Sequence, residues 1–145
     1  MSTPRPETIA AWTALVSVNG SLLEDIETAL KNAKLPKLSW YDALWEIEKV
    51  GAAGIRPYEL RERLLLPQYA LSRLLDRIAK AGLIERQDAK EDGRGQKIKI
   101  TPEGRAKRHA MWPIYADVLN RSIEQRLTQT ETAELAHLLK KLMRG

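Results

Sequence analysis

The chain has 145 residues, of which 43% are hydrophobic and 30% charged, a composition typical of one globular domain rather than of a disordered segment. It contains no cysteine, which excludes disulfide bonds, thiolate zinc sites and cysteine nucleophiles. No apolar run approaches the roughly 20 residues of a membrane span, and the N-terminus lacks the basic start and apolar core of a signal peptide, so we expect a cytoplasmic protein.

The net charge of +5 is unevenly distributed along the chain. Residues 56–108 carry 14 Lys/Arg and 8 Asp/Glu, whereas residues 1–55 carry 5 and 7. A local basic excess suggests a polyanionic partner. A well-solvated surface would explain the same charge, and charge alone does not separate the two interpretations.

Two helical segments open the chain. Residues 7–31 place apolar side chains at three- and four-residue steps, which predicts a helix that Asn19-Gly20 kinks or divides. Ser39-x-x-Asp42 resembles a capping box, in which a hydroxyl and a carboxylate satisfy free N–H groups. The helix that it opens is predicted to stop at Gly51.

The middle of the chain predicts two further helices. Pro57 suits the first position of a short helix over 57–64, because its missing N–H would have no partner there. The next helix is predicted over 67–81, and its buried face follows the spacing i, i+3, i+4, i+7: Leu71, Leu74, Leu75 and Ile78. The side chains left facing outward are Gln68, Tyr69, Ser72, Arg73, Asp76 and Arg77.

A hairpin with a charged, glycine-containing tip is predicted next. Its strands cover about 83–87 and 97–101, and the second alternates strictly between apolar and polar residues. Arg94 at the tip is well placed to enter a minor groove, where negative potential concentrates. The order helix, short helix, helix, hairpin predicts a winged helix-turn-helix, with helix 67–81 entering the major groove of DNA.

The C-terminal third is predicted to be helical. Thr101-Pro102 begins a long helix to about Leu127, kinked at Pro113. Thr128-x-x-Glu131 is a second capping box and opens a last helix. The apolar face of that helix consists of Leu135, Leu138, Leu139 and Leu142.

The segments "LLDRIAKAGLIER", "KIKITPEGR" and "LTQTETAELAHLLKKL" resemble the recognition helix, wing and dimerisation helix of the MarR family of transcriptional regulators. The resemblance covers about residues 7–143. It implies a single domain over 1–145 that is mainly α with a small β-hairpin wing. A winged helix lobe over 38–101 would lie between dimerisation helices over 5–33 and 102–145. A homodimer would bind an inverted-repeat operator in double-stranded DNA.

Side chains on the outward face of helix 67–81 and on the hairpin are predicted to contact DNA. They are Gln68, Tyr69, Ser72, Arg73, Arg77, Arg86, Arg94 and Lys97. Arg can bond guanine bidentately, and Gln can do the same with adenine. The alternative is that these side chains form an ordinary solvated helix face and contact no DNA. The resemblance implies that Asp92 is structural and pairs with Arg86 or Arg94.

The resemblance also implies that small anionic or phenolic ligands bind between the dimer base and the DNA-binding lobe. The candidate ligand-binding residues are Trp12, Trp40, Trp45 and Trp112, which plain core packing would also explain. We therefore predict a repressor relieved by an aromatic or phenolic ligand. The alternative is a winged-helix protein-interaction module that does not bind DNA.

No catalytic pattern is found in the sequence, and we expect neither an enzyme nor a cofactor. Ser-His-Asp spacing, paired carboxylates and a glycine-rich phosphate loop do not stand out. His109 and His137 are too few and too far apart in sequence to predict a metal site.

Overall fold

A computed structural model describes residues 2–64, 66–88 and 95–144. The elements in chain order are α1 (Pro6–Asn32), α2 (Leu38–Val50), the 3-10 turn η1 (Gly51–Ala53), α3 (Pro57–Leu64), α4 (Gln68–Lys80), β1 (Ile84–Asp88), β2 (Gln96–Ile100), α5 (Pro102–Leu119), the π-helical turn η2 (Asn120–Glu124) and α6 (Gln129–Leu142). The fold is therefore mainly helical with a two-stranded wing, which confirms the predicted fold class.

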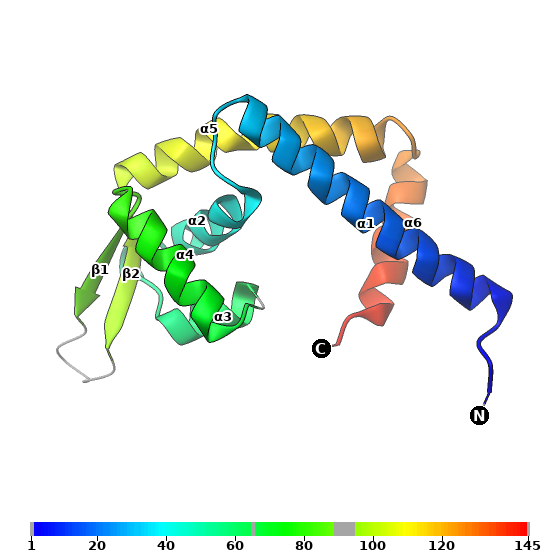
Figure 1. Cartoon of the computed structure of the whole chain (residues 1–145), viewed down its shortest axis with the longest axis horizontal. Coiled ribbons are helices and arrows are strands. Elements are labelled where there is room, and N and C mark those ends of the chain that lie inside the picture. Colours follow the sequence, from blue (N-terminus) through cyan, green and yellow to red (C-terminus); the bar gives the residue numbers. More distant parts are fainter. Residues whose placement is uncertain (1, 65, 89–94, 145) are drawn as a thin grey trace.

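Two bodies follow from this order (Figure 1). Helices α2, α3 and α4 with the hairpin share one hydrophobic core and are called the winged lobe, which lies on one side of the picture. Helices α1, α5 and α6, with η2, form the helical base. Helix α5 leads away from the hairpin to α6, and both chain termini lie at the far end of the base.

The winged lobe has its own hydrophobic core, built from the inward faces of α2, α3, α4 and the hairpin. The predicted face of α4 is buried, with Leu71, Leu74, Leu75 and Ile78 each less than 9% exposed. Strands β1 and β2 pair antiparallel. On the other side of β2, Ile55 forms an isolated β-bridge with Ile98 through two backbone hydrogen bonds of 2.8 and 2.9 Å. The hairpin is thereby fastened to the helices that it flanks.

A second core joins the lobe to the base. It contains Ile26 and Leu30 of α1, Leu38 and Tyr41 of α2, and Met111 and Val118 of α5. Helix α2 thus contributes side chains to both cores. Leu22, Glu27 and Ala29 of α1 are half-buried and the remainder of that helix is exposed, while α6 has no buried residue.

Three expectations about helix ends and breaks were wrong. Helix α1 runs without a break through Asn19-Gly20. Ser39 does not cap α2, because that helix begins at Leu38, whose N–H donates instead to Glu27 Oε1 at 2.9 Å. Helix α5 ends at Leu119 rather than near residue 127, and the chain continues through the π-helical turn η2.

Other local signals were correct. The capping box of α6 is present, with Glu131 N–H donating to Thr128 Oγ1 at 3.1 Å and Thr128 N–H donating to Glu131 Oε1 at 2.9 Å. Thr101 caps α5 by accepting from Gly104 N–H at 3.0 Å, and Pro113 lies inside that helix without ending it. Among the described residues, no helix is both long and apolar enough to cross a membrane.

The start of α5 packs so closely on the hairpin that it requires glycine at position 104. A methyl group there would overlap the carbonyl oxygen of Leu83 and would lie 2.7 Å from Ile100 Cγ1. We expect Gly104→Ala to lower the free energy of unfolding by about 1–3 kcal/mol, because overpacking displaces backbone as well as side chains. Urea unfolding followed by circular dichroism measures this loss.

Gly20→Ala is the matched control, since Gly20 lies in α1 and nothing would contact an added methyl group. Alanine is the better helix former by about 1 kcal/mol, so this variant should be as stable as the wild type or more stable. A Gly104→Ala protein as stable as Gly20→Ala would contradict the packing described at the start of α5.

Candidate nucleic-acid interface

Helix α4 presents a polar face opposite its buried one. Gln68, Tyr69, Ser72, Arg73 and Arg77 are all exposed, as the sequence predicts for side chains between the buried leucines. An α-helix with its side chains is about as wide as a DNA major groove, so an exposed polar helix face of this kind can reach base edges there. The arrangement brings five of the predicted contact residues onto one surface.

Two contacts hold side chains of this face in place. Arg61 of α3 donates from Nη1 to Gln68 Oε1 at 3.3 Å. The guanidinium of Arg73 lies over the ring of Tyr69, 5.8 Å from its centroid. Tyr69 is the most exposed aromatic side chain on the winged lobe, at 67%, so this stacked pair projects from the surface.

An ion pair connects the wing to α4. Arg86 of β1 donates from Nη2 to Asp76 Oδ1 of α4 at 2.7 Å. Lys97 of β2 is partly buried and pairs across the hairpin with Gln87. Arg86 therefore lies beside the polar face of α4. Asp92 and Arg94 lie outside the described residues.

Sequence reasoning missed Arg61 and Asp76 as members of this surface. Arg61 is on the neighbouring helix α3, and Asp76 was noted only as an outward-facing residue. The two contacts span 7 and 10 residues, and no local motif joins residues at those separations. A shallow concavity of about 380 Å³ lies between α3, α4 and the hairpin, lined in part by Tyr58, Arg61, Gln68 and Ser72.

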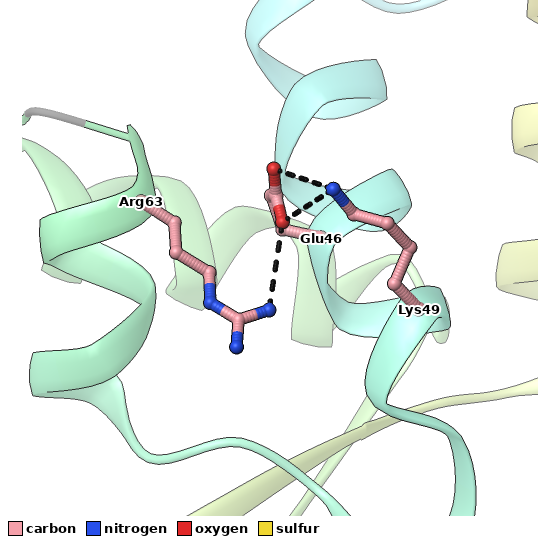
Figure 2. A network of polar contacts seen from close by, with 3 residues as sticks. All are labelled: Glu46, Lys49 and Arg63. Carbon is pink, nitrogen blue, oxygen red and sulfur yellow. Dashed lines mark hydrogen bonds and ion pairs between the residues drawn. The ribbon is translucent and has the colours of Figure 1, made fainter.

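A second polar network stabilises the side of the lobe (Figure 2). Glu46 of α2 bonds Lys49 on the same helix, with both carboxylate oxygens about 3 Å from Nζ. Arg63 of α3 approaches the same carboxylate at 3.6 Å. All three residues belong to the winged lobe. These partly exposed pairs contribute modestly to stability, about 0–1 kcal/mol each.

The four tryptophans do not converge on one site. Trp12 lies in α1 at the edge of a groove shared with α6 and is 65% exposed. Trp40 packs against the core of the winged lobe. Trp45 and Trp112 lie on α2 and α5, which meet at the junction of lobe and base. Of the four tryptophans predicted to bind a ligand, Trp45 and Trp112 are the two that lie at this junction.

The junction contains a compact aromatic group. Tyr41 stacks on Trp112 with ring centroids 5.9 Å apart, and Tyr115 meets both rings edge-on at 5.2 and 5.5 Å. Partial burial raises the pKa of Tyr115 above its usual value, and the negative charge of Asp42 raises it further. Its hydroxyl therefore stays protonated at neutral pH and can donate a hydrogen bond.

An apolar groove of about 720 Å³ separates the N-terminal half of α1 from α6. The α6 wall consists of the four leucines predicted for its apolar face: Leu135, Leu138, Leu139 and Leu142. The α1 wall includes Trp12, Leu15 and Val18. All these large apolar side chains are at least 36% exposed in the single chain. Among the described residues, no group of three or more His, Asp or Glu side chains is arranged to hold a metal ion.

These features define a winged helix-turn-helix protein, and comparison with known proteins shows which family it resembles. A sequence profile described as the MarR family matches residues 36–95. The multiple antibiotic resistance protein MarR of Salmonella typhimurium is 37% identical over 92 residues, which make up 63% of this chain. The matched region spans 64% of the length of that relative.

Solved structures extend the similarity to nearly the whole chain. A mutant MarR from Escherichia coli complexed with operator DNA has a TM-score of 0.83 and 28% identity, covering 99% of this chain and all of the other. The Streptomyces coelicolor MarR family regulator Sco3205, in complex with DNA, has a TM-score of 0.89 at 20% identity. It covers 98% of this chain and 89% of its own, and at that identity it supports the fold alone.

Residues 36–95 match the MarR family of winged helix-turn-helix transcriptional regulators, and the whole chain shares the fold of MarR. The resemblance stated from the sequence is thereby confirmed. The family is one of regulators and not of enzymes, which agrees with the absence of a catalytic pattern in the sequence.

Proposed function

We propose that this protein is a homodimeric, sequence-specific DNA-binding transcriptional regulator. The observation that carries the proposal is the exposed face of α4, with a stacked Tyr69–Arg73 pair at its first turns and the wing fastened beside it by Arg86–Asp76. Helix α4 would read base edges in the major groove, while the wing would contact backbone or minor groove. The similarity to an E. coli protein complexed with operator DNA supports duplex DNA as the partner.

Charge supports the same assignment. The basic excess of residues 56–108 falls on α3, α4, the hairpin and the start of α5, whereas α2 carries more acidic than basic side chains. Phosphate neutralisation by Lys and Arg supplies much of the affinity of proteins for duplex DNA. We propose phosphate contacts for Arg77, Arg86 and Lys97, and base contacts for Gln68, Ser72 and Arg73. Residues 38–101 would then be the DNA-binding lobe.

Selection of bound duplexes from a random pool is the experiment that tests this function. We expect an inverted repeat, because two copies present two recognition helices related by a two-fold axis. Arg73→Ala should relax the preference at one position of each half-site and weaken binding by about 1–3 kcal/mol. A pool that yields no enriched motif with the wild-type protein would contradict sequence-specific recognition.

Lys97→Ala is the control for that selection. A phosphate contact carries no sequence information, so this variant should recover the wild-type motif with uniformly weaker binding. Its dependence of log affinity on log salt should be shallower by about one unit. If Lys97→Ala altered the motif and Arg73→Ala did not, the proposed roles of helix and wing would be wrong.

We propose that dimerisation uses the apolar groove between α1 and α6. Helix α6 buries none of its residues in the single chain, and an isolated helix of its 14 residues is only marginally stable in water. A second copy that fills the groove would supply the missing packing. Residues 5–33 and 102–145 would then be the dimerisation helices.

Leu138→Glu tests the dimer. A charge placed in the groove without a partner costs several kcal/mol, so we expect dimerisation to weaken by roughly 100-fold or more. His137→Glu is the control, since His137 lies on the opposite face of α6 and outside the groove. Analytical ultracentrifugation should give monomer for the first variant and dimer for the second. A Leu138→Glu dimer as tight as the His137→Glu dimer would disprove the role of the groove.

We further propose a repressor that a small aromatic or phenolic ligand releases from DNA at the junction of lobe and base. The support is the half-exposed pair Trp45 and Trp112, with Tyr41 and Tyr115 between the helices that join the two bodies. A ligand that binds the free dimer better than the DNA-bound dimer must weaken DNA binding by the same factor.

A screen of small aromatic acids and phenols tests the ligand site, following tryptophan fluorescence and operator release together. We expect a hit to lower DNA affinity by roughly 5–150-fold. Trp45→Leu or Trp112→Leu should abolish the release, whereas Trp12→Leu and Trp40→Leu should retain it. Equal release from all four variants would locate the ligand elsewhere and leave these tryptophans as packing residues.

A further inference from the structure

One ion pair crosses from the helical base to the winged lobe. Arg108 of α5 donates from Nε to Glu48 Oε1 at 2.7 Å and from Nη2 to Glu48 Oε2 at 3.0 Å. The side chains are only 10% and 17% exposed, respectively. The two residues are 60 positions apart in the sequence. A bidentate Arg–carboxylate pair fixes both the distance between the guanidinium and the carboxylate and the relative orientation of these two planar groups.

Aromatic rings enclose this pair. The Arg108 guanidinium lies over the ring of Trp45, 4.6 Å from its centroid, and 5.9 Å from the centroid of Tyr41. The hydrogen bonds to Glu48 raise the pKa of Arg108, while burial opposes that shift less strongly. The guanidinium therefore stays charged and is confined by α2 side chains on more than one side. Arg108 cannot change its direction without moving α2 or breaking these contacts.

The pair supplies a constraint that the neighbouring hydrophobic core does not. Leu38, Met111 and the other members of that core hold α1, α2 and α5 together. Apolar contact is non-directional, so this core does not by itself specify the angle between lobe and base in the way that a bidentate ion pair does. Buried ion pairs contribute little net stability on average, because desolvation offsets their attraction. Directional bonding is the property that the core lacks and the pair adds.

We propose that Arg108 and Glu48 are positioning residues for operator recognition, which set the angle of the winged lobe on the helical base and so the spacing of half-sites that the dimer accepts. This inference rests on the proposed DNA-binding function. Neither residue lies on the exposed face of α4, and both act through the orientation of that helix. One added base pair shifts a half-site by about 3.4 Å and about 35° around the duplex, so small lobe rotations matter.

A series of duplexes tests the inference. Each carries the half-sites selected by the wild-type protein, with the central spacer shortened or lengthened by one or two base pairs. We expect the wild type to bind one spacer best, with a loss of roughly tenfold or more per base pair of change. Glu48→Gln keeps the size of the side chain but removes its charge and replaces one of its two accepting oxygens with an NH2 donor, so the bidentate contact with Arg108 is lost. We expect it to reduce that loss to about threefold or less while the preferred bases within each half-site stay the same.

Glu46→Gln is the matched control. Glu46 lies on the same helix two residues away and also forms ion pairs, but its partners Lys49 and Arg63 both belong to the winged lobe (Figure 2). This variant should keep the spacer profile of the wild type. An equal change in Glu46→Gln and Glu48→Gln would mean that any loss of charge on α2 has this effect, and it would overturn the inference.

The remaining outcomes are also decisive. If Glu48→Gln does not fold, Arg108→Lys replaces it, because lysine keeps the charge but cannot make the bidentate contact. An unchanged spacer profile in the folded variant overturns the inference, and so does unfolding of both variants, which would make the pair a folding element. Altered base preference within a half-site overturns it as well. Failure of the wild type to bind any duplex would refute the proposed function instead.

Discussion

Helix α2 is buried on two sides, and the rest of the structure depends on this constraint. Its Ala43, Leu44 and Ile47 are fully buried in the core of the winged lobe, while Leu38 and Tyr41 belong to the core shared with α1 and α5. A helix packed on both sides cannot move with one body without disturbing the other. The lobe that carries α4 is therefore mechanically connected to the helices that line the apolar groove. This connection would give a ligand or a partner at the base a physical route to the proposed DNA-binding face of α4.

Much of the apolar surface of the helical base is exposed in the single chain. Helix α1 buries only Ile26 and Leu30, near its C-terminal end, where it meets the shared core. Its first half and α6 extend away from the winged lobe (Figure 1). The large apolar side chains of both segments are exposed. Contiguous apolar surface of this kind marks an interaction site rather than a solvated exterior. The same chain thus divides its hydrophobic residues between folding and association.

Local signals in the sequence predicted the elements of this fold well. The spacing of Leu71, Leu74, Leu75 and Ile78 identified both faces of α4, and Thr128 with Glu131 identified the start of α6. Contacts between distant residues were not predictable in this way. The N–H at the start of α2 is satisfied by Glu27 of another helix, so the apparent capping box at Ser39 had no role. The partners of Arg86 and Arg108 likewise lie on other elements, where only folding brings them together.

We propose that the winged lobe binds duplex DNA through its basic surface, and the dependence of this affinity on salt concentration is the measurement that tests the proposal. Phosphate contacts release condensed counterions, whereas a protein interface need not. We predict that the affinity of the wild-type dimer for its selected duplex falls about 10³–10⁵-fold between 50 and 200 mM salt, as for proteins that contact six to ten phosphates. An affinity that stays constant over this range, or no measurable binding at the lowest salt, would contradict the account and favour a winged-helix module that binds another protein.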